Sequence, residues 1–174
     1  MHKELLNAAR LRIRIIPQSP LLVKAGGMDI KKPTDMQWVR TRHPQTGEET
    51  VYIPGSSLKG VLRSYAERLL RTKGLPICDP NIHERGATNL SCAKREVSDP
   101  FRSGERTPVE KLSSDKPDDE HGRTANQWKY LHLCAICRTF GSTCLRGRLS
   151  VSDAYPADPK AVKIETRYGV AISR

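Results

Sequence analysis

The sequence predicts an α+β protein, and three segments carry this prediction. Residues 10–16 (RLRIRII) alternate apolar and basic side chains, which is typical of a strand with one buried face. Residues 56–73 repeat leucines, Val61 and Tyr65 at helical spacing, which predicts an amphipathic helix. Residues 147–154 alternate again and predict a second strand. A chain of 174 residues fits one domain that carries an insertion.

The first predicted strand, residues 10–16, has two different faces. Its apolar face is expected to pack on a core and consists of Leu11, Ile13 and Ile15. Its basic face consists of Arg10, Arg12 and Arg14. Three arginines in one row on a sheet either form a solvated face or contact RNA or a neighbouring subunit, and the pattern leaves both interpretations open.

Residues 17–50 form a long excursion rich in Pro and Gly, and loops of this length are uncommon unless they are functional or disordered. A hairpin that turns at residues 44–47 is expected near its end. Asp29 and Asp35 stand in basic surroundings, where either carboxylate is a candidate to hold Mg²⁺ against a scissile phosphate or to assist a 2′-hydroxyl in attack. A solvated loop acid is the alternative. The chain contains no nucleophile elbow and no His-Glu-x-x-His motif, which excludes those classes of hydrolase.

The predicted helix begins on a Gly-Ser-Ser turn, in which Ser56 or Ser57 can accept hydrogen bonds from unpaired N–H groups. Lys59 and Arg63 follow in its first turns, where positive charge opposes the helix macrodipole by a few tenths to about 1 kcal/mol. Because an anion nearby would offset this cost, the turn and its two basic side chains form a candidate phosphate site. The order of residues differs from that of a Walker P-loop, in which Gly directly precedes Lys.

The charge of the chain favours a polyanionic partner. The net charge is +11, and residues 1–74 alone carry 14 basic against 6 acidic residues, a net of +8. Aromatic residues make up 5%, which argues for contacts with a phosphate backbone rather than base stacking. The arginines expected to make such contacts are Arg12, Arg14, Arg40 and Arg42. Because the chain has no long apolar run and no signal-peptide core, we expect a soluble, cytoplasmic protein without membrane contact.

Five cysteines in a chain without a secretion signal favour metal binding over a disulfide framework. Residues 79–128 form a polar insertion with too few apolar side chains to fold alone, and a zinc ion would supply the missing stability. The expected zinc ligands are Cys78, Cys92, Cys134 and Cys137. His83 is the alternative fourth ligand, and Cys144 is expected to be a small core residue. A full set of protein ligands makes this zinc structural rather than catalytic, and buried free thiols are the alternative.

Four segments of the chain are similar to one known family: YIPGSSLKGVLRSYAERLL at residues 52–70, CAICRTFGS at 134–142, GRLSVSDAYP at 147–156 and ETRYGVAISR at 165–174. They resemble the RNA-clamping backbone subunits of type III CRISPR effector complexes, within the repeat-associated mysterious protein (RAMP) superfamily. The first two motifs are the most specific. The cysteine arrangement is most similar to the zinc-bearing variants, including those of III-D systems and the fused III-E effector.

The resemblance implies a ferredoxin-like, RNA-recognition-type domain over residues 1–174. A thumb hairpin and catalytic loop would fall within residues 17–50, and a zinc-stabilised insertion bracketed by the ligands at residues 79–128. The implied partners are a CRISPR guide RNA, a target RNA, and other RAMP subunits or modules of the effector complex. The family's pattern continues beyond the equivalent of Arg174, so the chain is expected to be a fragment, a split subunit or one module of a larger fusion.

In active members of the family, a loop aspartate upstream of the Pro-Gly-Ser-Ser motif cuts target RNA with a divalent metal such as Mg²⁺ or Mn²⁺. That position falls on Asp35 in this sequence, with Asp29 as the alternative. The residues that match the family's contact with the guide backbone are Ser56, Ser57, Lys59 and Arg63.

Three other functions stay open at this point. The chain is a non-cleaving structural subunit of the same assembly, or it processes precursor guide RNA without metal through a histidine such as His43. The third alternative, from a different class, is a generic zinc-stabilised RNA-binding module, which would bind unrelated RNA with a steep dependence on salt.

Overall fold

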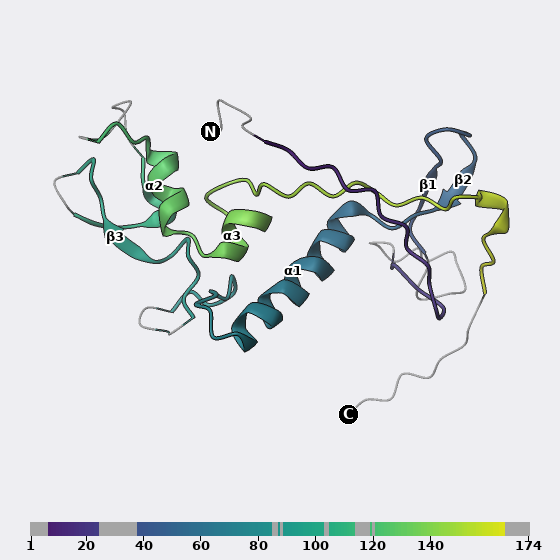
Figure 1. Cartoon of the computed structure of the whole chain (residues 1–174), viewed down its shortest axis with the longest axis horizontal. Coiled ribbons are helices and arrows are strands. Elements are labelled where there is room, and N and C mark those ends of the chain that lie inside the picture. Colours follow the sequence, from purple (N-terminus) through teal and green to yellow (C-terminus); the bar gives the residue numbers. More distant parts are fainter. Residues whose placement is uncertain are drawn as a thin grey trace, which may run out of the picture. The chain divides into compact units, whose positions relative to one another are not determined.

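The computed structural model describes residues 7–24, 38–84, 87, 89–102, 105–113, 119 and 121–165. Helices and small antiparallel sheets make the chain an α+β protein, as predicted (Figure 1). The chain divides into two compact units. One consists of Met1–Ile13 and Ser57–Val151 and is called the cysteine unit; the other consists of Arg14–Ser56 and Ser152–Arg174 and is called the hairpin unit. No helix in the described part of the chain is both long and apolar enough to span a membrane.

The hairpin unit contains the predicted hairpin. Strand β1 (Arg40–Arg42) pairs antiparallel with β2 (Glu49–Val51), with Thr41 opposite Thr50. The turn at residues 44–47 ends on Gly47, whose φ of 71° favours glycine. The predicted turn is therefore confirmed.

His43 shapes this turn from the inside. Its Nδ1 accepts hydrogen bonds from the backbone N–H groups of Gln45 and Thr46, each at 3.3 Å. The imidazole is buried and meets the ring of Tyr155 edge-on, with ring centroids 5.5 Å apart. Tyr155 also stacks on Tyr52 at 5.8 Å. The environment of His43 is therefore that of a structural histidine.

The prediction of a second strand at residues 147–154 is wrong for most of that segment. Only Ala154 makes a bridge, through two backbone hydrogen bonds of 2.9 Å with Ile53. The alternating side chains are present in the sequence, but a strand also requires a neighbour to pair with, and the described sheets are pairs of three-residue strands.

Helix α1 (Gly55–Thr72) matches the predicted helix closely. It begins one residue earlier than expected, so the two serines lie inside its first turn instead of preceding it. The anion at this end is Asp153, whose Oδ1 accepts a 2.7 Å hydrogen bond from the Gly55 N–H. The helix ends in a Schellman motif, with Gly74 at φ 74° and a 3.0 Å hydrogen bond from the Leu75 N–H to the Leu70 carbonyl.

The apolar stripe predicted on α1 does not pack on a core. Val61 is 70% exposed and Tyr65 is 63% exposed, and Leu62 and Leu69 are also exposed. The structure describes every residue of α1, and Gly55 is the one that is buried. Helical periodicity shows which face is apolar, but it does not show what covers that face.

The segment predicted to be the first strand, residues 10–16, is extended without forming a ladder with other described residues (Figure 1). Leu11 is 81% exposed and Ile13 is 74% exposed, so the predicted packing of this face on a core is wrong. The alternation favours a strand with one buried face, yet burial requires a second layer, which the described chain does not supply at this segment.

The core of the cysteine unit forms around sulfur. The buried side chains that make it are Cys78, Cys92, Val97, Val109, Leu112, Leu133, Cys137 and Leu145. Three of its apolar members, Val97, Val109 and Leu112, come from the polar insertion at residues 79–128. The insertion therefore contributes few apolar side chains, but it buries them against the cysteines.

Short elements surround this core. Strands β3 (Glu96–Ser98) and β4 (Arg106–Pro108) pair antiparallel, and helices α2 (Ala125–His132) and α3 (Ala135–Phe140) follow. The 3₁₀ turn η1 (Val109–Lys111) also lies in this unit, whereas the 3₁₀ turn η2 (Pro159–Ala161) belongs to the hairpin unit. A capping box starts α2, in which Thr124 and Gln127 satisfy each other's backbone N–H groups.

A tight loop follows α3 and is called the glycine loop, residues 141–147. The Ser142 N–H donates to the Leu145 carbonyl at 2.9 Å, and Gly141 forms a bridge with Arg146. Gly141 has a φ of 100°, and a Cβ added to it would lie 2.8 Å from the Gly147 nitrogen. The two backbones approach this closely because both ends of the loop are glycines.

We expect Gly147→Ala to lower the free energy of unfolding by about 1–3 kcal/mol or more, because the added Cβ would overlap the Phe140 carbonyl and lie 2.5 Å from the Gly141 nitrogen. Gly60→Ala in α1 is the matched control, since its Cβ meets nothing within 4 Å. That control should raise stability by about 0.5–1 kcal/mol. Urea denaturation measures both, and a Gly147→Ala protein as stable as the parent would contradict the loop geometry.

Candidate functional site

Four cysteine sulfurs meet in the centre of the cysteine unit. The Sγ atoms of Cys78, Cys92, Cys134 and Cys137 all lie within 4.8 Å of one another. Cys78 follows the end of α1, Cys92 comes from the insertion, and the other two lie at the start of α3. The structure thus brings together the four cysteines that the sequence predicts as ligands.

The spacing of the sulfurs suits a tetrahedral metal site. A Zn–S bond of about 2.3 Å places the sulfurs of a tetrahedral site about 3.8 Å apart. The Cys78 Sγ lies 3.7 Å from the Cys134 Sγ and 3.5 Å from the Cys137 Sγ. These distances are far longer than the bond of about 2.05 Å in a disulfide, and all the cysteines are free. The four thiols can therefore hold a metal such as zinc.

Hydrogen bonds among the four thiols move their pKa values in different directions. Hydrogen bonding with Cys137 lowers the pKa of Cys134, and hydrogen bonding with Cys134 raises the pKa of both Cys92 and Cys137. For Cys78, the hydrogen bond with Cys134 raises the pKa, and those with Cys137 and Cys92 lower it to about 7. Neighbouring thiolates repel one another, so a bound cation is what makes four ionised sulfurs favourable.

A backbone hydrogen bond joins two of the cysteines, and His83 and Cys144 lie outside the four-sulfur cluster. The Cys134 N–H donates to the Cys92 Sγ at 3.2 Å, which holds the start of α3 against the insertion. His83 is exposed and outside the sulfur cluster, so the described ligand set is four cysteines rather than three cysteines and a histidine. Cys144 packs against the core, and its Sγ lies 3.2 Å from the Ser142 Oγ.

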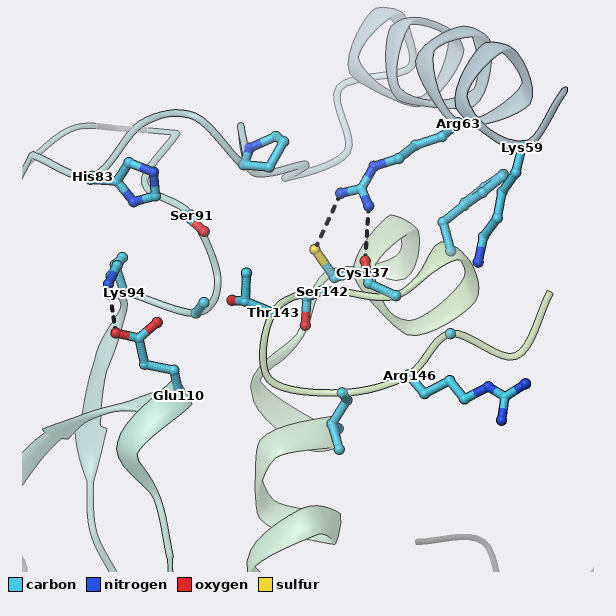
Figure 2. A pocket seen from close by; sticks show the side chains of 16 residues that line it. Lys59, Arg63, His83, Ser91, Lys94, Glu110, Cys137, Ser142, Thr143 and Arg146 are labelled. Carbon is cyan, nitrogen blue, oxygen red and sulfur yellow. Dashed lines mark hydrogen bonds and ion pairs between the residues drawn. The ribbon is translucent and has the colours of Figure 1, made fainter. Parts of the chain in front are cut away.

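Arg63 connects α1 to the cysteine centre (Figure 2). Its Nη1 donates to the Gly141 carbonyl at 2.8 Å, its Nη2 lies 3.9 Å from the Cys137 Sγ, and its Nε donates to Glu67 at 2.8 Å. Burial lowers the pKa of Arg63, but Glu67 and Cys137 raise it to a net value above the ordinary one. Each nitrogen of the guanidinium thus has one partner within the protein, and Nη2 faces the Cys137 sulfur.

A cavity of about 620 Å³ lies beside the cysteine centre, between α1, α3, the glycine loop and the insertion. Its basic side chains are Lys59, Arg63, Lys94 and Arg146. Its hydroxyl groups come from Ser91, Ser142 and Thr143. Lys94 is paired with Glu110 at 2.6 Å on one side of the cavity, and Lys59 reaches down from α1 on the other (Figure 2). The cavity therefore combines positive charge with hydrogen-bonding groups.

The other residues predicted to bind RNA lie in different surroundings. Ser56 and Ser57 are exposed in the first turn of α1, and Arg12 and Arg14 are exposed in the extended N-terminal segment. Arg40 and Arg42 lie on β1, where both are exposed. Arg40 also pairs with Glu49 across the hairpin at 3.2 Å, an exposed contact that contributes little stability.

The predicted catalytic residues, Asp29 and Asp35, lie outside the described residues.

Two features of the site were not predicted from the sequence. Asp153 reaches the start of α1 from 98 positions away, and no local pattern indicates that contact. The glycine loop had a detectable signal in its two flanking glycines, which favour a tight turn that presents Ser142 and Thr143.

We expect purified protein to contain one zinc ion per chain, and Cys92→Ser to lose the metal and melt at a lower temperature, because thiolate binding and folding of the insertion are coupled. Cys144→Ser and His83→Ala are the matched controls and should keep the zinc. Elemental analysis and thermal melting measure this. Full zinc content in Cys92→Ser, or none in the parent protein, would contradict the assignment.

Comparison with known proteins identifies the family of this chain. Residues 18–174 match the family model of the RAMP superfamily. Neither the search of curated proteins nor the search of solved structures finds a match. The matched segment includes α1, all four clustered cysteines and the glycine loop. Because the match covers most of its length, this chain belongs to the RAMP superfamily.

Proposed function

We propose that this chain is a backbone subunit of a type III CRISPR effector complex, of the zinc-bearing kind found in III-D and III-E systems, and that it binds guide RNA. The observation that carries the proposal is the match of residues 18–174 to the RAMP superfamily, since membership supports a CRISPR-associated RNA-binding role. The proposed partners are the guide RNA, its target RNA and other RAMP subunits of the complex.

The chemistry of the chain supports RNA as the ligand. The net charge of +11 attracts a polyanion, and the basic side chains at the cavity give part of that charge a defined place. The four-cysteine centre supports the zinc-bearing type, because it stabilises the insertion without leaving a position for substrate. In this proposal the domain is ferredoxin-like, with a thumb within residues 17–50 and the zinc-stabilised insertion at residues 79–128.

We further propose that the subunit cleaves target RNA through Asp35, with Asp29 as the alternative. A loop carboxylate can hold Mg²⁺ or Mn²⁺ beside a scissile phosphate, which is the role the family resemblance assigns to that position. A non-cleaving structural subunit is the competing proposal, and it differs only in this loop.

The structure argues against one of the two remaining alternatives. Processing of precursor guide RNA through His43 requires an accessible imidazole, whereas this one is 8% exposed and its Nδ1 already accepts two backbone hydrogen bonds. A generic RNA-binding module remains testable, because it would carry RNA without regard to sequence.

The first experiment is to purify the protein gently from its native host and to sequence the RNA that accompanies it. We expect repeat-flanked guide RNA of uniform length, because backbone subunits line one guide. A broad mixture of cellular RNA would instead favour the generic module and would remove the CRISPR assignment.

The cleavage proposal predicts that guide-loaded complex cuts complementary RNA in Mg²⁺, and that Asp35→Ala lowers the rate by at least about 100-fold while guide binding is unchanged. Asp29→Ala tests the alternative in the same loop: it should retain activity if Asp35 is catalytic, whereas loss of cleavage in Asp29→Ala alone would assign the role to Asp29. Denaturing gels of labelled target RNA measure the rate. Cleavage that survives in the Asp35→Ala/Asp29→Ala double variant would rule out both aspartates.

A further inference from the structure

Three charged side chains on one face of α1 lie against the cysteine centre, and they are called the α1 row: Arg63, Glu67 and Arg71. Each follows the previous one by four positions, so the helix places them on the same face. The Glu67 carboxylate lies between the two guanidinium groups, 2.8 Å from the Arg63 Nε and 3.8 Å from the Arg71 Nη2. Because the Glu67 side chain is only 14% exposed, water screens these pairs less than pairs at the surface.

Each arginine of the α1 row reaches a segment that carries a predicted metal ligand. The Arg63 Nη1 donates to the Gly141 carbonyl, and its Nη2 lies 3.9 Å from the Cys137 Sγ (Figure 2). The Arg71 Nη2 donates to the Cys78 carbonyl at 2.9 Å. The row therefore contacts two of the four cysteines, one at its sulfur and the other at its backbone.

The charge of the α1 row is opposite to that of the metal-loaded centre. Four thiolates and one divalent cation carry a net charge of −2, whereas two guanidinium groups and one carboxylate carry +1. Cys78 and Cys137 are each 3% exposed, so the attraction acts where little water reaches. At 3.9 Å the contact between Arg63 and sulfur acts mainly through charge.

We propose that the α1 row sets how tightly the cysteine centre holds its metal, with Arg63 acting on the Cys137 thiolate and Arg71 holding the Cys78 backbone. Groups that contact metal ligands from outside commonly change metal affinity by about 10–100-fold. Arg63 and Arg71 are then positioning residues of the metal centre, and Glu67 aligns them. The inference goes beyond the proposed function, because it concerns the metal and requires no RNA.

The first test measures the zinc affinity of the purified chain by competition with a chromogenic chelator. We expect Arg63→Gln to weaken zinc binding by about 10–100-fold and Arg71→Gln to weaken it by up to about tenfold. Arg63→Lys keeps the charge without the planar fork, so its affinity should lie between those of Arg63→Gln and the parent protein. The matched control is Arg68→Gln, which removes an exposed charge of the same helix outside the α1 row and should leave the affinity unchanged.

Cobalt(II) in place of zinc separates an effect on the centre from a general loss of stability, because its absorption spectrum reports only the metal-loaded protein. The intensity of the sulfur-to-cobalt charge-transfer band reports the number of bound thiolates, and its position reports the electron density on sulfur. Removing the positive charge beside Cys137 raises the energy of the sulfur electrons. We therefore expect Arg63→Gln to shift the band to longer wavelength at unchanged intensity, and Arg71→Gln and Arg68→Gln to leave its position unchanged.

Zinc affinities of Arg63→Gln and Arg63→Lys equal to that of the parent protein would overturn the proposal. An equal loss in Arg68→Gln, or a weaker cobalt band in Arg63→Gln that shows a lost thiolate, would also overturn it, since the row would then only support the fold. If Arg63→Gln does not fold, Arg63→Lys decides: an affinity below that of the parent supports the proposal, and an equal one rejects it. None of these results changes the RNA-binding proposal, which depends on the RNA that accompanies the protein.

Discussion

Four sulfur atoms within 4.8 Å of one another are the constraint on which the cysteine unit depends. The insertion contributes Val97, Val109 and Leu112 to the core, and few other apolar side chains are available to hold it. A segment with so little buried apolar surface cannot offset its own conformational entropy. Thiolate coordination would supply that stability directly, because a metal bound here would join four points of the chain that lie as far as 59 positions apart.

Arg63 extends this constraint to the cavity. Its guanidinium binds the Gly141 carbonyl and lies against the Cys137 sulfur, so one side chain connects α1, α3 and the glycine loop. The zinc-loaded form would carry four thiolates and one divalent cation, a net charge of −2, which an adjacent guanidinium stabilises. The position of Lys59, one turn earlier on α1, follows from this anchoring. In this way the cysteine centre fixes the position of α1 beside the cavity.

The N-terminal part of α1 shows how charged side chains are used in this protein. Asp153 accepts a hydrogen bond from Gly55, so a carboxylate within the protein already stabilises the N-terminal end of the helix dipole. The basic start of α1 therefore has an internal counterpart. Lys59 stays available for a ligand, whereas Arg63 is used for architecture. Two residues that look equivalent in the sequence thus have different roles, because only one of them has acceptors within reach.

The sequence by itself determined the features that depend on neighbouring residues: the hairpin turn at 44–47, the helix from Gly55 to Thr72 and the Cys-x-x-Cys pair. Turn residues, capping and helical spacing act within a few positions, so local patterns are sufficient for them. The tertiary structure decided which partners meet. It placed Asp153 at the start of α1 and left Leu11 and Val61 exposed. Periodicity identifies an apolar face, but the path of the whole chain determines whether anything covers it.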